Sequence, residues 1–211
     1  MTVKKLFRWK PIEVALLAGL AVCLLSGGVA VRTQEQLADR MIRLHVLANS
    51  DSKADQSLKL EVRDVVTART EILLEHVSER QEAELILRRH LSELEQLAED
   101  CVRAAGYVYP VNVELAVTDF PTKEYDGFSL PAGEYLALRV LIGEAAGQNW
   151  WCVVFPPLCA AASSDVAVTA LAAGLEEEQV RLITEEDGYV LKFKTVELWQ
   201  YLLKKIENKK M

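Results

Sequence analysis

The chain that follows residue 40 alternates between apolar and polar side chains. Ile42, Leu44 and Val46 project to one side of an extended backbone, while Arg43 and His45 project to the other. Successive side chains of a β-strand point to opposite faces. This period of two therefore predicts a half-buried strand, with its apolar face toward the core.

An amphipathic helix is predicted directly after this strand. The turn-forming run 49–55 contains Ser52 three residues before Asp55, a spacing typical of a helix N-terminus. Apolar residues then recur at helical spacing, which predicts a helix with one buried face. These residues are Leu58, Val62, Val65, Val66, Ile72, Leu73 and Val77.

A second amphipathic helix follows, and Gly106 marks its end. Ser78 and Gln81 repeat the spacing of the first helix start, which predicts that Ser78 caps this helix. Its apolar face is formed by Leu87, Leu91, Leu94, Ala98 and Val102. We expect the two helices to form an antiparallel pair.

The second half of the chain changes to strand periodicity. Residues 111–120, 134–143 and 150–155 each carry a strand pattern, and the middle one is apolar enough on both faces to be largely buried. Residues 121–133 contain two prolines and two glycines and read as a turn-rich connection. Residues 143–149 read as a glycine-bearing hairpin loop. The pattern predicts a three-stranded meander.

The remaining elements complete an α+β fold. Residues 160–187 are predicted to form loops around a loose helix, and residues 189–210 a short strand that runs into an amphipathic helix. The sum is a single compact domain, with a mixed or antiparallel sheet covered by amphipathic helices on one face.

The N-terminal segment predicts the compartment. Four basic residues precede an uncharged apolar run over residues 14–31, which would extend about 27 Å as a helix, slightly short of a hydrocarbon core of about 30 Å. Positive charge before such a run keeps the N-terminus in the cytoplasm and directs the remainder across the membrane. Ala30 is the candidate cleavage position, and both cleavage and retention as an anchor stay open.

These patterns divide the chain into three parts. Residues 1–31 are expected to be a signal peptide or membrane anchor, residues 32–40 a short helix or stalk, and residues 41–211 an exported α+β domain. Over 211 residues the formal net charge is −7, which disfavours nucleic acid as a partner. Three histidines without metal-ligand spacing predict no metal site, and the absence of a phosphate-binding motif predicts no nucleotide cofactor.

The cysteines leave several interpretations open. Cys152 or Cys159 could act with His45 as the nucleophile of an exported cysteine hydrolase, which needs a thiol and an imidazole within hydrogen-bond reach. A disulfide between Cys152 and Cys159 across the Pro-Pro turn suits an exported protein. Two buried free thiols are the third interpretation.

The pair Trp150-Trp151 stands at the start of a predicted strand. Neighbouring side chains of a strand face opposite ways, so one tryptophan is expected in the core and the other at the surface. An exposed tryptophan beside a glycine loop is a frequent interface anchor.

Two long stretches carry a family resemblance. They read MIRLHVLANSDSKADQSLKLEVRD, from Met41, and VTDFPTKEYDGFSLPAGEYLALRVLIGEAAGQNWWCVVFPPLC, up to Cys159. Together with the preceding apolar segment they strongly resemble the stage II sporulation protein R family of endospore-forming bacteria.

The resemblance implies a secreted signalling protein rather than an enzyme. Such a protein is made in the forespore and exported into the space between the two septal membranes. There it activates a membrane-embedded aspartic protease of the mother cell, which removes the pro-sequence of the sigma-E precursor. The catalytic carboxylates would then belong to the partner.

Matching motif positions suggest where the partner binds. We expect a surface formed by an early turn, two residues of the following helix and the edge of a later strand. The residues are Asn49, Ser50, Asp51, Gln56, Lys59, Asn149, Trp150 and Trp151. The alternative for the turn residues is ordinary turn formation and helix capping. A retained membrane protein with a scaffold role is a further alternative function.

Overall fold

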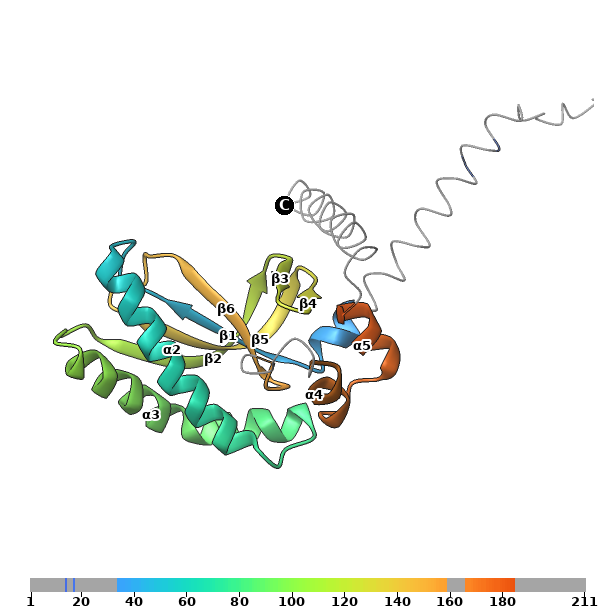
Figure 1. The fold of residues 1–211 in the computed structure, drawn as a ribbon, viewed down its shortest axis with the longest axis horizontal. Coiled ribbons are helices and arrows are strands. Elements are labelled where there is room, and N and C mark those ends of the chain that lie inside the picture. The colour runs from blue at the N-terminus through green and yellow to red at the C-terminus, as the bar shows by residue number, and fades with distance from the viewer. Residues whose placement is uncertain (1–13, 15–16, 18–33, 159–165, 185–211) are drawn as a thin grey trace, which may run out of the picture.

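A four-stranded mixed sheet organises the part of the chain that the computed structural model describes, namely Val14, Leu17, residues 34–158 and residues 166–184 (Figure 1). Its strands are β1 (Ile42–Leu47), β2 (Val111–Phe120), β5 (Gly133–Ile142) and β6 (Asn149–Phe155). Their order is β2-β5-β1-β6; β1 is parallel to β5, and the other two pairings are antiparallel. The α+β class with a mixed sheet is confirmed.

The predicted meander is wrong in its topology. β1 lies between β5 and β6, so Leu44 pairs with Leu138 on one side and with Cys152 on the other. The connection from β5 to β6 is therefore not a hairpin loop, because it must cross the end of β1. Strand periodicity identifies strands and their faces, but it does not specify which strands are neighbours.

Two helices, α2 (Lys53–Leu74) and α3 (Arg80–Ala104), cover one face of this sheet and form the main core with it (Figure 1). Most of the predicted apolar stripe of α2 packs on the core, and Leu58 and Val62 are at most 1% exposed. Ile72 is the exception, since it is 64% exposed. Burial of a side chain of this size contributes roughly 2 kcal/mol to folding. The prediction that Ser52 caps α2 is confirmed, since its Oγ accepts the Asp55 N–H at 3.1 Å.

The predicted cap of the second helix is wrong. The residue before α3 is Glu79 rather than Ser78, and no side chain caps this helix. Glu79 has extended backbone angles, and the N–H of Ala83 bonds its carbonyl at 3.0 Å, so the helix begins one residue later than the Ser-x-x-Gln spacing implied. The capping pattern predicted the helix correctly but not its first residue.

A second group of elements gathers at one end of the sheet (Figure 1). Residues 121–133, predicted as an irregular connection, contain the two-stranded hairpin β3 (Lys123–Tyr125) and β4 (Phe128–Leu130). The region predicted as loops around a loose helix contains α4 (Val166–Ala172) and α5 (Glu177–Thr184). These elements enclose a smaller core with Leu37, Met41, Phe128, Leu130, Val153, Leu158, Val166, Ala170, Leu175, Val180 and Ile183.

Residues 34–40 belong to the segment expected as a short helix or stalk, and they pack on the folded domain. They begin with a helical turn whose Leu37 is fully buried in the smaller core, and Gln34 is also buried. The leader, its cleavage position at Ala30 and the C-terminal helix predicted within residues 189–210 lie outside the described residues. Within the described part, no helix is long and apolar enough to span a membrane.

Candidate functional site

The turn after β1 is organised by a buried carboxylate that sequence inspection treated only as a helix-start residue. Asp55 is 4% exposed, and its Oδ2 accepts hydrogen bonds from Asn49 Nδ2 at 3.0 Å and from Ser50 Oγ at 2.5 Å. These donations, first from Ser50 and then from Asn49, lower the pKa of Asp55. The side chains of Asn49 and Ser50 therefore hold the turn to the first turn of α2.

Two glycines let the loop between β5 and β6 lie directly on this turn. Gly143 has a φ of +59°, and a Cβ atom there would lie 2.2 Å from the Asn49 Oδ1. At Gly147 a Cβ would lie 2.3 Å from the carbonyl oxygen of Ser50. Only glycine permits this approach without displacing the turn.

Backbone N–H groups of the loop bind the turn. Asn49 Oδ1 accepts from the Glu144 N–H at 3.0 Å, and Asp51 Oδ1 accepts from the Gln148 N–H at 2.7 Å. The carbonyl oxygens of Ala48 and Asn49 accept from two further loop N–H groups. Asn49 and Asp51 thus supply acceptors for backbone N–H groups of the loop. In a simple hairpin, these N–H groups would instead bond to carbonyl oxygens of the hairpin itself.

Gln56 and Lys59 of α2 complete this network. Gln56 Nε2 donates to the Ser50 carbonyl at 2.9 Å, and Lys59 Nζ donates to Gln56 Oε1 at 2.6 Å and to the Gln148 carbonyl at 2.9 Å. Lys59 is 4% exposed, and burial lowers its pKa while the charge of Asp51 opposes that shift. We call residues 48–56, Lys59 and residues 143–150 the turn–loop cluster.

The structure thus brings the predicted partner-binding residues together. Five of the eight, namely Asn49, Ser50, Asp51, Gln56 and Lys59, interact within the turn–loop cluster. Their main hydrogen-bond groups are used inside the molecule, which indicates that most of them position the surface rather than contact a partner. The exposed rim of the cluster includes Asp51 and Asn149.

The two tryptophans face opposite sides of the sheet. Trp150 lies at the helix-covered side and is 36% exposed, with the Arg63 Cζ 4.3 Å from its ring centroid. Trp151 is half-buried on the other side, beside the rings of His45 and Phe120. Trp150 is therefore the large apolar side chain that the cluster presents to solvent.

The cysteine hydrolase interpretation fails for Cys152. This residue pairs with Leu44 and lies in the main core, whereas His45 lies on the opposite face of the sheet. Its sulfur is already in a disulfide, so it is not a free nucleophile. Cys159 lies outside the described residues, and its pairing with Cys152 stays a prediction.

The polar face of β1 is more deeply buried than its sequence pattern predicted. His45 is 7% exposed and Arg43 is fully buried, so the prediction of a half-buried strand is wrong. The Arg43 Cζ lies 4.0 Å from the ring centroid of Phe120 and 4.9 Å from that of Tyr135, and its Nη2 donates to the Tyr125 hydroxyl at 2.6 Å. Alternation places a side chain on a face, but it does not show that other elements cover that face.

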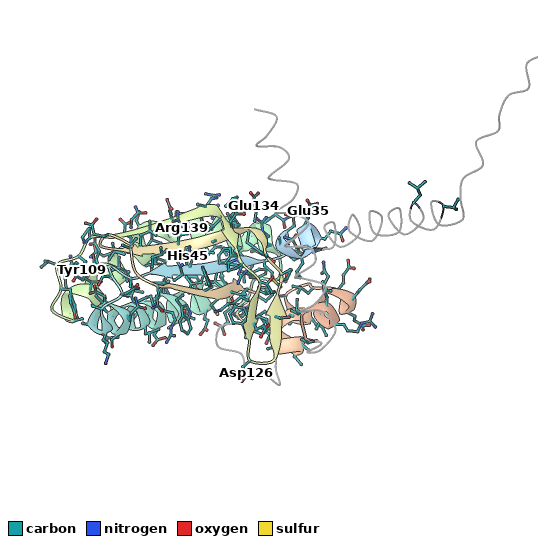
Figure 2. The ribbon with its side chains drawn as sticks, turned by 90° about the horizontal axis from the view of Figure 1, so that it is seen from above. Glu35, His45, Tyr109, Asp126, Glu134 and Arg139 are labelled. Carbon is teal, nitrogen blue, oxygen red and sulfur yellow. The ribbon has the colours of Figure 1, made fainter. Side chains whose placement is uncertain are left out.

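His45 is held by one polar and two aromatic neighbours. Its Nε2 lies 2.7 Å from the Asn149 Oδ1, and burial lowers its pKa against the raising effect of that hydrogen bond. Asn149 therefore fixes the imidazole in place rather than presenting its own amide oxygen to a partner. Arg139 lies beside His45 on the adjacent strand β5 (Figure 2).

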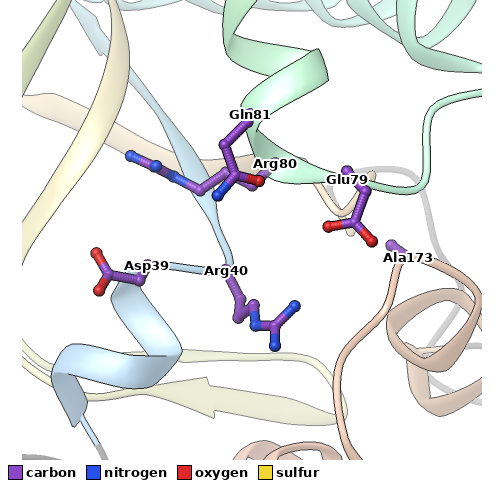
Figure 3. A pocket seen from close by; sticks show the side chains of 6 residues that line it. All are labelled: Asp39, Arg40, Glu79, Arg80, Gln81 and Ala173. Atoms are coloured by element: carbon purple, nitrogen blue, oxygen red, sulfur yellow. The ribbon is translucent and has the colours of Figure 1, made fainter.

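A cavity of about 310 Å³ lies apart from these residues, at the start of α3 (Figure 3). Its lining carries both signs of charge: Asp39 and Arg40 come from the segment before β1, and Glu79 and Arg80 from the α3 N-terminus. Arg80 also has Glu84 within 3.7 Å. The mixture of charges gives this cavity no preference for an anion or a cation.

Comparison with known proteins connects this architecture to a family. The family model of stage II sporulation protein R matches residues 38–165, which include the whole sheet, α2, α3 and the turn–loop cluster. The chain belongs to this family. The stage II sporulation protein R of Bacillus subtilis (strain 168) is 37% identical over 147 residues, an alignment that covers 68% of this chain and 66% of that protein. No solved structure matches the chain.

Membership in the stage II sporulation protein R family assigns the chain a role in sporulation. The chain aligns with somewhat less than two thirds of the length of its B. subtilis relative. The family name describes a sporulation protein.

Proposed function

We propose that this member of the stage II sporulation protein R family is an exported signal that activates a membrane-embedded aspartic protease by binding it. The activated protease would then process the mother-cell sigma-E precursor, as the family resemblance implies. The chain would be exported across the forespore membrane into the septal intermembrane space, released by cleavage near Ala30 or held there by its leader. The family match over residues 38–165 is the observation that carries this proposal.

The turn–loop cluster supports a binding role because it is rigidly preassembled. An activator works by binding the active arrangement of its target more tightly than the inactive one. Moving a protease from about 1% to about 99% active requires roughly 5.5 kcal/mol of such differential affinity. A surface whose turn, loop and helix are already hydrogen-bonded to one another loses little conformational entropy when it binds.

Trp150 is the proposed anchor of this surface. Its ring is 36% exposed and stacked by Arg63, and the exposed Asp51 and Asn149 belong to the same cluster. Tryptophan and arginine are the residue types most enriched among those that dominate binding energy. Asn49, Ser50, Gln56 and Lys59 then act as positioning residues for this rim.

Co-expression in a heterologous host tests the function. The full chain, the candidate protease and its sigma-factor precursor are expressed together, and cleavage of the precursor is followed by immunoblot. We expect cleavage only when all three proteins are present. Precursor that stays uncleaved, with all three proteins detected in their expected compartments, would refute the proposed function.

Substitution of Trp150 tests the anchor. Trp150→Ala should reduce cleavage in this assay by at least about tenfold, since loss of a central aromatic residue costs about 2 kcal/mol or more in binding. The matched control is Leu85→Ala, which removes an apolar side chain that is 56% exposed on α3. Equal cleavage by both variants, with equal thermal stability, would exclude Trp150 as the anchor.

A further inference from the structure

The sheet face opposite α2 and α3 is covered at one end only. The hairpin β3–β4 and helices α4 and α5 pack over the end that contains Val153. Toward the other end, the outward positions of the four strands are exposed or half-buried, except His45, which is 7% exposed. Those that we call the open face are Leu47, Asn112, Glu114, Ala116, Arg139, Leu141 and Trp151.

The open face is positively charged in a chain whose formal net charge is −7. Arg139 lies at its centre, and Lys123 of the hairpin borders it with Nζ 5.5 Å from the Trp151 ring centroid. Arg43 occupies the same side of β1 and adds a third cation under the hairpin. Among the outward strand positions in the described residues, Glu114 is the one carboxylate.

Hydrogen-bond donors on this side outnumber their acceptors. Six buried side-chain polar atoms in the described residues lack a partner, and three of them are guanidinium nitrogens here: Nε and Nη1 of Arg43 and Nε of Arg139. Nη1 of Arg139 is bonded to Glu114 Oε1 at 2.5 Å. Glu114 is paired with Arg139, whereas Arg43 donates to the Tyr125 hydroxyl and has no carboxylate partner among the described residues. Buried charges with unmatched donors favour an additional anion nearby.

Apolar groups surround these cations. Trp151, Leu47 and Leu141 are half-buried, whereas their counterparts on the helix-covered side of β1 and β5, Val46 and Val140, are completely buried. A half-exposed aromatic ring beside cationic groups is typical of a protein recognition surface.

We propose that the open face is a docking surface for an acidic segment of the partner protein. Arg139 and Lys123 bind carboxylates of this segment, while Trp151 and Leu141 pack against its apolar side chains. Arg43 lies too deep for direct contact and contributes through its electrostatic potential, which is weakly screened at a buried position. The identity of the partner rests on the proposed function, whereas the acidic chemistry rests on the charges of the face.

The ion pair between Arg139 and Glu114 allows a test in which two substitutions should change the binding affinity in opposite directions. Arg139→Gln and Glu114→Gln break the same pair, so a purely structural role predicts similar effects. Docking of an acidic segment predicts opposite effects, because Arg139→Gln removes an attractive charge and Glu114→Gln removes the repulsive one. Both side chains are partly exposed, at 27% and 41%, so neither variant should unfold the domain.

Direct binding measures this difference. The full chain in detergent is titrated with a fluorescent octapeptide of alternating Glu and Val, and with a matched peptide that carries Gln in place of Glu. We expect the Glu peptide to bind about tenfold more tightly at low salt, with Arg139→Gln weakening it about tenfold and Glu114→Gln tightening it about threefold. Equal affinity for the two peptides, or shifts in the same direction for the two variants, would overturn the proposal.

The protease assay separates this surface from the proposed function. Activation that responds to Arg139→Gln and Glu114→Gln in opposite directions supports both ideas, and activation unaffected by either variant overturns the docking surface alone. If the unsubstituted chain activates no protease, the proposed function fails while the peptide titration still decides the surface. Displacement of the Glu peptide by a synthetic 185–211 peptide would assign the face to this chain's own C-terminal segment instead.

Discussion

The turn–loop cluster follows the ends of β1 and β5, and the open face reaches the same ends through Leu47 and Leu141. The two regions differ in whether their polar groups have hydrogen-bond partners. In the cluster, the side chains of Asn49, Ser50 and Asp55 bond to one another or to loop N–H groups. On the side of the sheet that carries the open face, guanidinium groups of Arg43 and Arg139 keep donors without acceptors. Satisfied polar networks stabilise one arrangement of the chain, whereas unsatisfied charges favour a ligand. The same strands can thus supply both a rigid frame and a binding surface.

Removal of the carboxylate at the centre of the cluster should have the largest effect. Asp55→Ala leaves the Asn49 and Ser50 donors without their buried acceptor, and we expect a loss of about 3 kcal/mol in the free energy of unfolding. Urea denaturation followed by circular dichroism measures it. The control is Asp64→Ala, whose exposed pair with Arg63 should contribute less than about 1 kcal/mol. Equal losses for the two variants would show that the cluster does not stabilise the fold.

A methyl group added at the contact between the loop and the turn should cause the next largest loss of stability. Gly147→Ala places a Cβ near the Ser50 carbonyl, and relief of that overlap should cost about 2 kcal/mol of folding free energy. Ala146→Ser, at the exposed preceding position, is the matched control and should change stability by less than about 0.5 kcal/mol. Crystal structures of both variants would show whether the loop moves away from the turn.

Acidification should weaken the cluster in a defined direction. The pKa of Asp55 lies below its ordinary value of 3.8, so its ionised form contributes stability that is present above that pH and lost as the pH falls through the folded-state pKa. One such proton changes the unfolding free energy by at most about 1.4 kcal/mol per pH unit. Denaturant titrations from pH 5 downward should therefore show a shallower decline for Asp55→Asn than for the unsubstituted chain, and parallel declines would contradict this assignment.

The smallest effect on stability is expected for Arg43, which lies under the hairpin next to the open face. Arg43→Met replaces a buried cation by an apolar side chain of similar length, and such replacements are often neutral or stabilising, so we expect a change within about 1 kcal/mol. The same variant should weaken binding of the Glu peptide about threefold through its lost positive potential. A large loss of stability with unchanged peptide affinity would make Arg43 a structural residue of the hairpin contact.

Local patterns predicted the secondary structure well because each is produced by neighbours in the chain. The Ser52 cap, the buried stripe around Leu58 and the strands of the sheet all follow from spacing of this kind. The insertion of β1 between β5 and β6 was missed, because it is decided by packing between distant segments. The glycines at 143 and 147 were the available clue, since a simple hairpin did not require both.

The sequence identified most residues of the turn–loop cluster, but it did not predict the hydrogen bonds that these residues make inside the molecule. Family resemblance selected Asn49, Lys59 and Trp150 together, and the structure places them on one cluster. The buried carboxylate of Asp55 and the buried guanidinium of Arg43 were missed, because charged residues are usually expected at the surface. Their burial depends on segments far along the chain, such as the hairpin that carries Tyr125.

The central place of β1 also sets an order of events during synthesis. This strand leaves the ribosome first among the four, but both of its neighbours, β5 and β6, are made much later. Pairings between such distant segments form slowly and only after the intervening chain is complete. The sheet therefore cannot close until β6 has been made, which would keep the chain open during the export that we propose.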